Sequence, residues 1–479
     1  MENKGLIKDL LNRFAAADEH SIAFSLYDGS GVTHIPFRKF LEDVLQATGY
    51  FVHKGMKCRH IAIAAPNSYD WLVMFLAITG SGNVAVLLNQ DLPEEVVGRQ
   101  CKQADVTVIC TDCPDRFAGL HDTDMEWIGF EEIKKGHPVA LDDICCANSD
   151  ETVAMIFTSG TTGKSKIVVF TAYNLQSILE DLEEELSGPN LRSVLLMFPL
   201  YHISGLTMVI SLLRVNRTIC IGRGIRYLLM DIPVLNPSII PMVPATLNSL
   251  VKLLKTAKSE EDRRKYIGSD LAAIAVGGAS VNPALCRYMM DLGIEVRSAY
   301  GMTESAGAGT FCIWQDENMG SIGKPYGKTE CRIVDGELLL RSPSVMKGYY
   351  KDPEETAKIL EDGWLHTGDL AYCDDNGYYY LTGRKKNVMI LSNGENVNPE
   401  EIEAAFSECP EILESMVYND AKGICADVYT KEKAACAAFI RKYNDSVPLY
   451  RQVYKVNYSA SPLEKTGSGK IKRKENAYV

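Results

Sequence analysis

A segment rich in glycines, hydroxyls and lysines stands out as a candidate binding loop. It reads Thr158-Ser-Gly-Thr-Thr-Gly-Lys-Ser-Lys166 and directly follows the apolar run Val153–Phe157. Glycines let the backbone turn tightly, so that successive N–H groups point into one concavity, while hydroxyl and ammonium groups add donors and positive charge. This chemistry favours a bound phosphate. The segment is not a Walker A loop, because that motif requires glycine at the position of Thr158.

Six further motifs follow downstream, and each combines turn-forming residues with side chains capable of chemistry. Several carry carboxylates, among them Glu304 and Asp369, and others carry histidine, tyrosine, arginine or lysine. Taken singly, each is typical of a turn, a core residue or a solvated tail. The motifs are Phe198-Pro-Leu-Tyr-His-Ile-Ser-Gly205, Gly277-Gly-Ala279, Tyr300-Gly-Met-Thr-Glu304, Gly363-Trp-Leu-His-Thr-Gly-Asp369, Gly383-Arg384 with Leu391–Glu401, and Lys465-Thr-Gly-Ser-Gly-Lys470.

In this order the seven motifs resemble those of the ANL superfamily of adenylate-forming enzymes, which comprises acyl- and aryl-CoA synthetases, adenylation domains and luciferases. The resemblance runs from about residue 20 to residue 474. It implies a reaction that joins a carboxylic acid to the α-phosphate of ATP, and positioning and charge neutralisation dominate the catalysis of such transfers between anions. The phosphate loop departs from the family's usual Pro-Lys-Gly, since it reads Ser165-Lys166-Ile167 but retains the lysine.

The resemblance also implies roles for the residues at matching positions. Lys470 would be the catalytic lysine that bridges carboxylate and α-phosphate oxygens as charge develops. Glu304 would be the Mg²⁺ ligand, because a hard cation takes oxygen ligands, and Thr303 would donate to a phosphate. Tyr300 would stack on adenine, and Asp369 would accept hydrogen bonds from the ribose hydroxyls. The remaining predicted ATP or AMP contacts are Thr158, Ser159, Gly160, Thr161, Thr162, Gly163, Lys166, Gly278, Ala279, Gly301 and Arg384.

The acid and the acceptor are predicted on the same basis. His202 would gate the acyl pocket, which also includes Gly205, Gly277, Met302, Ala306 and Gly307. Residues 198–206 contain no Asp or Glu, whereas amino-acid-activating members carry an acidic residue there for the substrate ammonium. The segment instead resembles acyl- and aryl-CoA ligases, including the succinylbenzoate type. Lys386 would be a hinge between two half-reactions, and Gly394 would line a tunnel for the thiol.

We therefore predict an ATP-dependent ligase that forms acyl-AMP and then a CoA thioester, with Mg²⁺ as cofactor. Two alternatives stay open. A stand-alone adenylation enzyme would load the phosphopantetheine arm of an acyl carrier protein, and a catalytically inactive relative would only bind nucleotide. The retained Glu304, Asp369 and Lys470 argue against the inactive relative.

The elements that must position these residues alternate in type. Short apolar runs, such as 61–65, 106–110, 194–197, 218–221 and 271–276, alternate with helical patterns at 172–186 and 244–256. This alternation predicts an α/β protein with largely parallel sheets. After residue 330 the pattern changes to hairpins with turns at 335–336 and 374–377, followed by a helix near 399–406. We expect a large layered N-terminal domain, 1–385, and a small mobile α+β C-terminal domain, 386–479.

The composition is that of an ordinary globular protein. Of 479 residues, 46% are hydrophobic and 23% are charged, and the net charge is −12. The acidic balance argues against nucleic acid as a partner, because nucleic-acid binding needs a basic surface. No signal peptide is visible, and the longest apolar run, Trp71–Leu88, contains glycines and polar residues that predict a helix, a turn and a strand. We expect free cysteines, a cytoplasmic protein without integral membrane association, and a small carboxylic acid as its partner.

Overall fold

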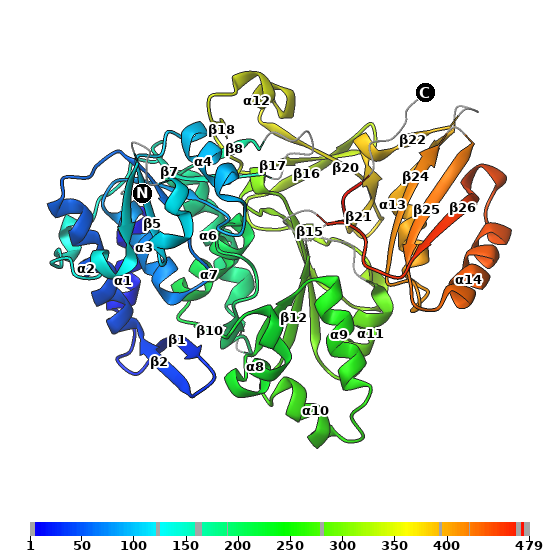
Figure 1. Cartoon of the computed structure of the whole chain (residues 1–479), viewed down its shortest axis with the longest axis horizontal. Coiled ribbons are helices and arrows are strands. Elements are labelled where there is room, and N and C mark those ends of the chain that lie inside the picture. The colour runs from blue at the N-terminus through cyan, green and yellow to red at the C-terminus, as the bar shows by residue number, and fades with distance from the viewer. Residues whose placement is uncertain are drawn as a thin grey trace.

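Two large sheets form the centre of the molecule (Figure 1). The computed structural model describes residues 5–120, 125–158, 165–188, 190–277, 282–391, 395–420, 422–465 and 471–473. The first sheet consists of β1 (Ile22–Tyr27), β2 (Val32–Pro36), β9 (Ser193–Leu195), β10 (Thr218–Ile221), β11 (Ile239–Met242), β12 (Ala273–Gly277), β13 (Glu295–Gly301), β14 (Gly309–Ile313) and β15 (Lys324–Pro325). The second consists of β3 (His60–Ile63), β4 (Val84–Leu87), β5 (Val108–Thr111), β6 (Glu126–Gly129), β7 (Thr152–Phe157), β8 (Ile167–Thr171) and β18 (Gly348–Tyr349).

Both sheets are mainly parallel. The strand orders are β15-β14-β13-β12-β11-β9-β10-β1-β2 and β18-β8-β7-β4-β3-β5-β6. Antiparallel pairing is confined to the edges, where β2, β14, β15, β8 and β18 lie. The predicted α/β class is thus confirmed. Because the carboxyl ends of parallel strands gather at one edge of a sheet, the motifs that follow β7, β12 and β13 emerge at such edges.

Helices lie between the two sheets and on their outer faces. The central layer holds α1 (Leu6–Ala15), α2 (Phe37–His53), α3 (Tyr69–Gly80), α5 (Phe130–Ile133), α6 (Ala172–Leu186) and α7 (Ile203–Arg214), and its apolar side chains form the largest core. The outer face of the first sheet is covered by α8 (Leu228–Leu235), α9 (Pro244–Leu254), α10 (Glu260–Ile267) and α11 (Pro283–Asp291). The outer face of the second is covered by α4 (Glu94–Gln103). The layers therefore alternate between helix and sheet.

Several predicted elements have the predicted bounds, and others differ by one or two residues. Helix α6 and strand β10 begin and end where the pattern places them. The run predicted as a strand at 61–65 forms β3, which ends at Ile63, although Ala64 and Ala65 are buried beyond it. An apolar run marks burial, and burial continues past the last paired residue of a strand. Helix α9 likewise ends at Leu254, two residues before the predicted limit.

A third, antiparallel sheet lies beside the first two. It contains β16 (Glu330–Val334), β17 (Glu337–Arg341), β19 (Leu360–Glu361), β20 (Trp364–Cys373) and β21 (Tyr379–Arg384), and α12 (Pro353–Ile359) precedes β19. Both predicted hairpins are present. In the β16–β17 turn, Asp335 and Gly336 have φ of 50° and 78°, the left-handed pair that a two-residue hairpin requires.

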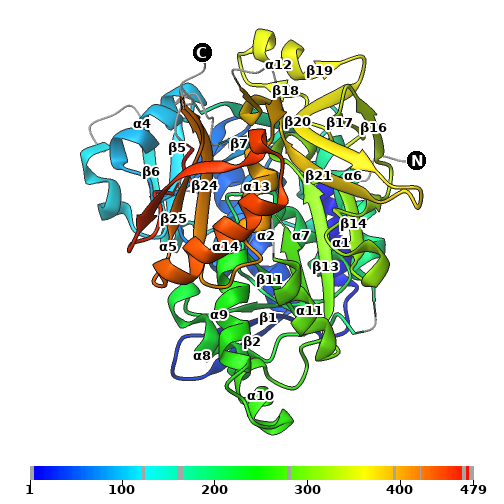
Figure 2. The same ribbon diagram turned by 90° about the vertical axis from the view of Figure 1, so that its right-hand side faces the viewer.

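The C-terminal region is small and rich in strands. It contains β22 (Met389–Ile390), β23 (Asn396–Val397), α13 (Pro399–Phe406), β24 (Glu414–Asp420), β25 (Gly423–Tyr429), α14 (Lys433–Ser446) and β26 (Val453–Ser459). Its apolar side chains form a core of their own. It lies next to β20 and β21, as Figures 1 and 2 show from two directions. The Asn282 amide, at the start of α11, donates a hydrogen bond of 2.5 Å to the carbonyl of Ser407.

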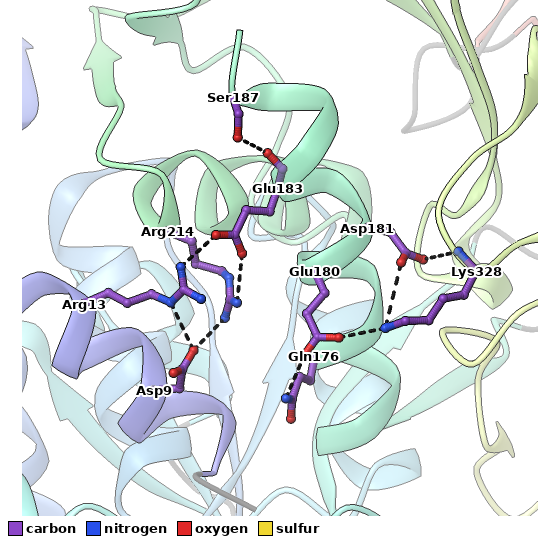
Figure 3. A network of polar contacts seen from close by, with 9 residues as sticks. All are labelled: Asp9, Arg13, Gln176, Glu180, Asp181, Glu183, Ser187, Arg214 and Lys328. Carbon is purple, nitrogen blue, oxygen red and sulfur yellow. Dashed lines mark hydrogen bonds and ion pairs between the residues drawn. The ribbon is translucent and has the colours of Figure 1, made fainter. Parts of the chain in front are cut away.

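A partly buried ionic network ties three helices of the central layer together (Figure 3). Arg214, at the end of α7, contacts Asp9 Oδ2 of α1 and Glu183 Oε2 of α6, each at 3.1 Å. Arg13 contacts the same two carboxylates at 3.2 and 2.8 Å. Each guanidinium therefore faces both anions, and the side chain of Arg214 is 3% exposed. The network fixes the far end of α7, whose first turn carries predicted acyl-pocket residues.

Two further observations concern the chain as a whole. Within the described ranges, no helix combines the length and apolar character that crossing a membrane requires. All fourteen cysteines are free.

Candidate active site

Asp369 lies at the centre of a cluster of predicted nucleotide-binding residues. Its side chain is buried, yet both carboxylate oxygens have partners. The Tyr300 hydroxyl donates to Oδ2 at 2.6 Å, and Arg384 Nε lies 2.7 Å from Oδ1. Burial and then the charge of Asp369 raise the pKa of the Tyr300 phenol well above its ordinary value, so this hydroxyl remains a donor. The cluster joins an aromatic ring, an anion and a cation within one contact network.

The third sheet supplies this geometry. Asp369 on β20 and Arg384 on β21 are direct cross-strand neighbours. The Thr367 hydroxyl accepts the N–H of Asp369 at 3.0 Å and donates to the Leu338 carbonyl of β17 at 2.6 Å. The side chain of Asp369 is thus fixed by strand pairing and by a buried hydroxyl, while Tyr300 reaches it from the end of β13.

Glu337 of β17 stabilises the backbone next to Asp369. Its carboxylate accepts the N–H of Gly368 at 2.9 Å and contacts His366 Nδ1 at 3.3 Å and Lys385 Nζ at 3.0 Å. Burial opposes its ionisation, but the pKa of Glu337 is nonetheless lowered because Lys385, the Gly368 N–H and His366 stabilise the anion. Glu337 therefore connects the strand that carries Asp369 with the residue that precedes the predicted hinge.

A second carboxylate, Glu304, lies one turn beyond Tyr300. It belongs to the short helix η4 (Thr303–Ser305) and is 9% exposed. The Tyr349 hydroxyl donates to its Oε1 at 2.8 Å, which leaves Oε2 for another partner. Burial and then Glu304 raise the pKa of Tyr349, which keeps this phenol a donor. An oxygen ligand of this kind fits the predicted binding of a hard divalent cation.

The phosphate loop is described at its two ends. The N–H of Thr158 donates to the carbonyl of Lys166 at 2.9 Å, so β7 and β8 continue their pairing up to the neck of the loop. Lys166 Nζ lies 2.6 Å from Glu355 Oε2 on α12 and 4.7 Å from the centre of the Tyr349 ring. Tyr349 therefore contacts the loop lysine with its ring and Glu304 with its hydroxyl.

Close backbone contacts shape the predicted acyl pocket. A Cβ at Gly301 would lie 2.2 Å from the Gly307 carbonyl oxygen, so only glycine fits there. Ala306, with φ of 57°, and Gly307, with φ of 86°, form the left-handed turn that makes this approach possible. A Cβ at Gly307 would lie 3.9 Å from the Thr207 hydroxyl, which places the turn beside α7. Met302 precedes η4 and packs partly against the core of the third sheet.

The first turn of α7 and the segment before it form the other side. His202 is the residue before α7, and its ring centre lies 4.6 Å from that of Tyr201. A Cβ at Gly205 would lie 2.4 Å from the Pro199 carbonyl oxygen. The Asn67 amide holds this segment from the second sheet, because its Nδ2 donates to the Phe198 carbonyl and its Oδ1 accepts the Leu200 N–H, each at 2.8 Å.

The structure describes two further predicted positions, Gly277 of the acyl pocket and Lys386 of the hinge. Gly277 ends β12, where a Cβ would lie 2.8 Å from the Ala299 carbonyl oxygen, so the close pairing with β13 requires glycine. Lys386 is exposed within η6 (Lys385–Asn387), directly after β21. The other predicted residues lie outside the described ranges: Ser159, Gly160, Thr161, Thr162, Gly163, Gly278, Ala279, Gly394 and Lys470.

Four residues of this site were absent from the sequence-based prediction: Asn67, Glu337, Tyr349 and Glu355. Asn67 offered a signal, because it is a polar residue shortly after a buried strand of a parallel sheet. Glu337 also offered one, as an acidic residue at the start of a buried hairpin strand. Tyr349 and Glu355 offered none, since their partners lie far away in the sequence.

Layered parallel sheets, a glycine-rich loop with a lysine at its end and two carboxylates near strand ends define a class, the enzymes that activate a carboxylic acid with ATP. Comparison with known proteins agrees. The family model described as AMP-binding enzyme matches residues 11–350. The chain belongs to this family, and its predicted place among the adenylate-forming enzymes is confirmed.

Curated relatives narrow the class. The chain is 31% identical to the 2-succinylbenzoate–CoA ligase of Bacillus cytotoxicus over 76% of each chain. It is 29% identical to the ligase of the same name from Bacillus cereus strain Q1 over 80% of each chain. The predicted activity is thereby confirmed as that of an AMP-forming, ATP-dependent ligase with CoA as acceptor and Mg²⁺ as cofactor.

Solved structures confirm the fold. The O-succinylbenzoate coenzyme A synthetase of Bacillus subtilis in complex with AMP superposes with a TM-score of 0.83 at 23% identity, over 97% of both chains. An anthranilate CoA ligase in complex with anthranoyl-AMP gives a TM-score of 0.86 at 18% identity, over 97% of this chain and 95% of the other.

Proposed function

We propose that this ligase activates an aromatic carboxylic acid, with 2-succinylbenzoate as the first acid to test. The carrying observation is the cluster at Asp369, where an anion, an aromatic ring and a cation meet at the carboxyl end of β13. We choose 2-succinylbenzoate because the curated relatives are named as ligases of this acid. The absence of an acidic residue from 198–206 supports it, because an amino-acid substrate would need a partner for its ammonium group.

On the nucleotide side, Asp369 accepts hydrogen bonds from the ribose hydroxyls, and Tyr300 forms a platform for adenine. Arg384 then serves two partners, the Asp369 carboxylate and the nucleotide. Gly301 leaves space for a close approach, and Gly278 and Ala279 complete the adenine contact by the family resemblance. The existing contacts of Asp369 support this assignment, since they fix the direction of the carboxylate before the nucleotide arrives.

On the phosphate side, Thr158, Lys166 and residues 159–163 bind the phosphates that leave as pyrophosphate. Thr303 donates to a phosphate oxygen. Glu304 offers the carboxylate oxygen that would hold Mg²⁺, which neutralises phosphate charge when it is bound. Tyr349 orients the Glu304 carboxylate through Oε1. Lys470, by the resemblance, neutralises charge between the carboxylate and the α-phosphate.

The acid occupies the space between the η4 turn and the start of α7. His202 stands at its entrance, and Gly205, Gly277, Met302, Ala306 and Gly307 line it. A Cβ built on Gly307 would lie 3.9 Å from the Thr207 hydroxyl, which supports a shared wall between these two elements. Small side chains there leave room for a ring beyond the carboxylate.

The second half-reaction needs a rearrangement of the chain after Arg384. We propose domains 1–385 and 386–479 that rotate about Lys386, withdrawing Lys470 and bringing the Gly394 segment to the thiol. Separate apolar cores on either side of η6 support such a rotation. CoA is the thiol in this second step, and no comparison supports an acyl carrier protein in its place.

The first experiment incubates the protein with ATP, Mg²⁺ and single acids, with and without CoA, and follows AMP and thioester by mass spectrometry. The acids are 2-succinylbenzoate, simple benzoates, fatty acids and amino acids. We expect 2-succinylbenzoyl-CoA and AMP. Thioester only with another class of acid would contradict the substrate, and acyl-AMP that persists with CoA present would favour a carrier protein.

A further inference from the structure

Glu355 is an acidic side chain placed against the lysine of the phosphate loop, and it lies outside the motifs that predicted the site. It belongs to the first turn of α12, where Asp352 accepts its N–H at 3.1 Å. Its Oε2 lies 2.6 Å from Lys166 Nζ. The two residues are 189 positions apart in the sequence, so the fold creates this contact.

The contact lies beside the path that phosphates must take. Lys166 also lies 4.7 Å from the centre of the Tyr349 ring, and the Tyr349 hydroxyl bonds Glu304. Phosphates held between the loop lysine and the predicted cation ligand would therefore pass next to Glu355. A carboxylate at this place repels them and competes with them for the same ammonium group.

The charge and exposure of the pair make such competition possible. Hydrogen bonds from Lys166 and then Lys358 lower the pKa of Glu355 to about 2, so it is an anion at neutral pH. The side chains of Lys166 and Glu355 are 27% and 32% exposed. Solvent screens an ion pair of this kind, and its net contribution to stability is small. Exchange of one anion for another is therefore easy.

We propose that Glu355 is an internal competitor of phosphate for Lys166. Its carboxylate holds the Lys166 ammonium while the phosphate site is empty, releases it to the phosphates of ATP, and takes it back as pyrophosphate leaves. This inference rests on the phosphate-binding role proposed for Lys166. A polyphosphate carries more charge than one carboxylate, so it displaces Glu355 on binding. The competition lowers the affinity for pyrophosphate and thereby favours its release.

The test removes the charge and keeps the shape, with Glu355→Gln in the full chain. Binding of ATP and of inorganic pyrophosphate, each with Mg²⁺, is measured by calorimetry. We expect both dissociation constants to fall roughly three- to fivefold, the upper part of the range for loss of an exposed charge interaction. The KM for ATP falls, kcat does not rise, and pyrophosphate inhibits at lower concentration. Unchanged or weaker binding of pyrophosphate would overturn the proposal.

Two controls separate competition from a general charge effect. Glu354→Gln removes the same charge from the neighbouring, exposed position of α12, and we expect its dissociation constants to stay within about twofold of the wild type. In a Lys166→Met background, Glu355→Gln should give less than half of the gain, on a logarithmic scale, that it gives in the wild type. An equal gain from Glu354→Gln, or an undiminished gain without Lys166, would contradict competition for this lysine.

The wild-type chain separates this inference from the proposed function. If the wild type binds no ATP and forms no AMP with any acid, the proposed function fails and the role of Glu355 fails with it. If the wild type forms acyl-CoA but Glu355→Gln binds pyrophosphate as the wild type does, only the inference about Glu355 fails. Glu355→Asp, which keeps the charge on a shorter side chain, should lie between the wild type and Glu355→Gln.

Discussion

At the scale of single residues, the site depends on carboxylates whose partners are already in place. Asp369 is held between Tyr300 and Arg384, and Glu304 is oriented by Tyr349. Each carboxylate is thus held in a fixed direction without a ligand. Preorganised charges of this kind stabilise a reacting nucleotide more effectively than mobile ones, because they need no reorganisation at the moment of reaction.

Asp369→Asn tests the nucleotide contact. The amide keeps the shape but loses the charge, so the bonds to ribose weaken and Arg384 loses its anionic partner. We expect kcat/KM for ATP to fall roughly 10- to 100-fold, since hydrogen bonds to charged groups are worth about 1.5–3 kcal/mol. Steady-state pyrophosphate release measures it. An unchanged kcat/KM with an intact thermal unfolding midpoint would contradict the assignment.

Lys470→Ala tests the division of the reaction into two steps. The variant should lose roughly 10²–10³-fold in acyl-AMP formation, the range found when a charge-stabilising donor is removed. It should still convert synthetic acyl-AMP and CoA into thioester, because the lysine acts only in the first step. Single-turnover assays of each half-reaction measure both rates. Equal losses in the two steps would show that Lys470 has another role.

At the scale of elements, a helix that carries a predicted site residue at one end is held by contacts at its other end. Helix α7 carries Gly205 near its start, and Arg214 anchors its end to α1 and α6 (Figure 3). Strand β21 carries Arg384 and leads directly into η6. Contacts outside the site therefore help to place the functional residues.

Arg214→Ala tests the ionic network. The change leaves the partly exposed Asp9 and Glu183 with only Arg13, so we expect the free energy of unfolding to fall by about 1.5–3 kcal/mol, the usual value of hydrogen bonds to charged groups. Urea unfolding measures it. Arg192→Ala is the control, because Arg192 is 69% exposed and lies 3.6 Å from Asp270. This control should change stability by less than about 1 kcal/mol. Equal losses would mean that burial does not matter here.

Lys386→Pro tests the hinge. Proline fixes φ, so a rotation that needs a change at this residue is blocked. Adenylation should persist, whereas transfer from synthetic acyl-AMP to CoA should slow by at least about tenfold. The comparison is Lys385→Pro, one residue earlier, which tells a specific hinge from general damage to η6. Unimpaired thioester formation in Lys386→Pro would place the hinge elsewhere.

At the scale of the whole molecule, pH changes the protonation of a carboxylate packed within the C-terminal region. Arg473 contacts Glu403 Oε2 at 2.7 Å and Glu400 Oε1 at 3.0 Å. Burial raises the pKa of Glu403 to about 7, although Arg473 opposes the shift. The contact joins the last described residue of the chain to α13.

This pKa gives a signed prediction for stability. The folded chain holds a proton on Glu403 up to about pH 7, whereas the unfolded chain releases it near its ordinary pKa of 4.5. The contribution of Glu403 is therefore largest below pH 4.5 and is lost as the pH rises to 7, with a slope of at most about 1.4 kcal/mol per pH unit. The difference in unfolding free energy between wild type and Glu403→Gln should fall over this range. A difference independent of pH would contradict the shift.

The sequence allowed much of this to be predicted because local patterns determine local structure. Helix α13 has the predicted bounds, and the turn at Asp335 and Gly336 forms the predicted hairpin. The motif residues Tyr300, Asp369 and Arg384 converge, as an ordered set of motifs in one family would require.

Register and distant contacts could not be predicted. Counted from the pair Cys373 and Tyr379, the β20–β21 register would place Asp369 opposite Gly383. A bulge between Leu370 and Ala371 shifts the register by one residue and brings Arg384 opposite instead. No residue pattern in the sequence indicates this bulge. The contacts of Lys166 with Glu355 and of Tyr349 with Glu304 depend on tertiary structure in the same way.

The position of Arg384 immediately before η6 has a thermodynamic consequence. Arg384, which is proposed to contact the nucleotide, and Lys386, the proposed hinge, are two positions apart. At this point Glu337 accepts the Gly368 N–H of β20 and pairs with Lys385, the residue after β21. If nucleotide binding stiffens this strand end, it must bias the rotation. By reciprocity, a rotated C-terminal region must change nucleotide affinity by the same factor. Substitutions at the hinge will therefore alter the KM for ATP even when they touch no atom of it.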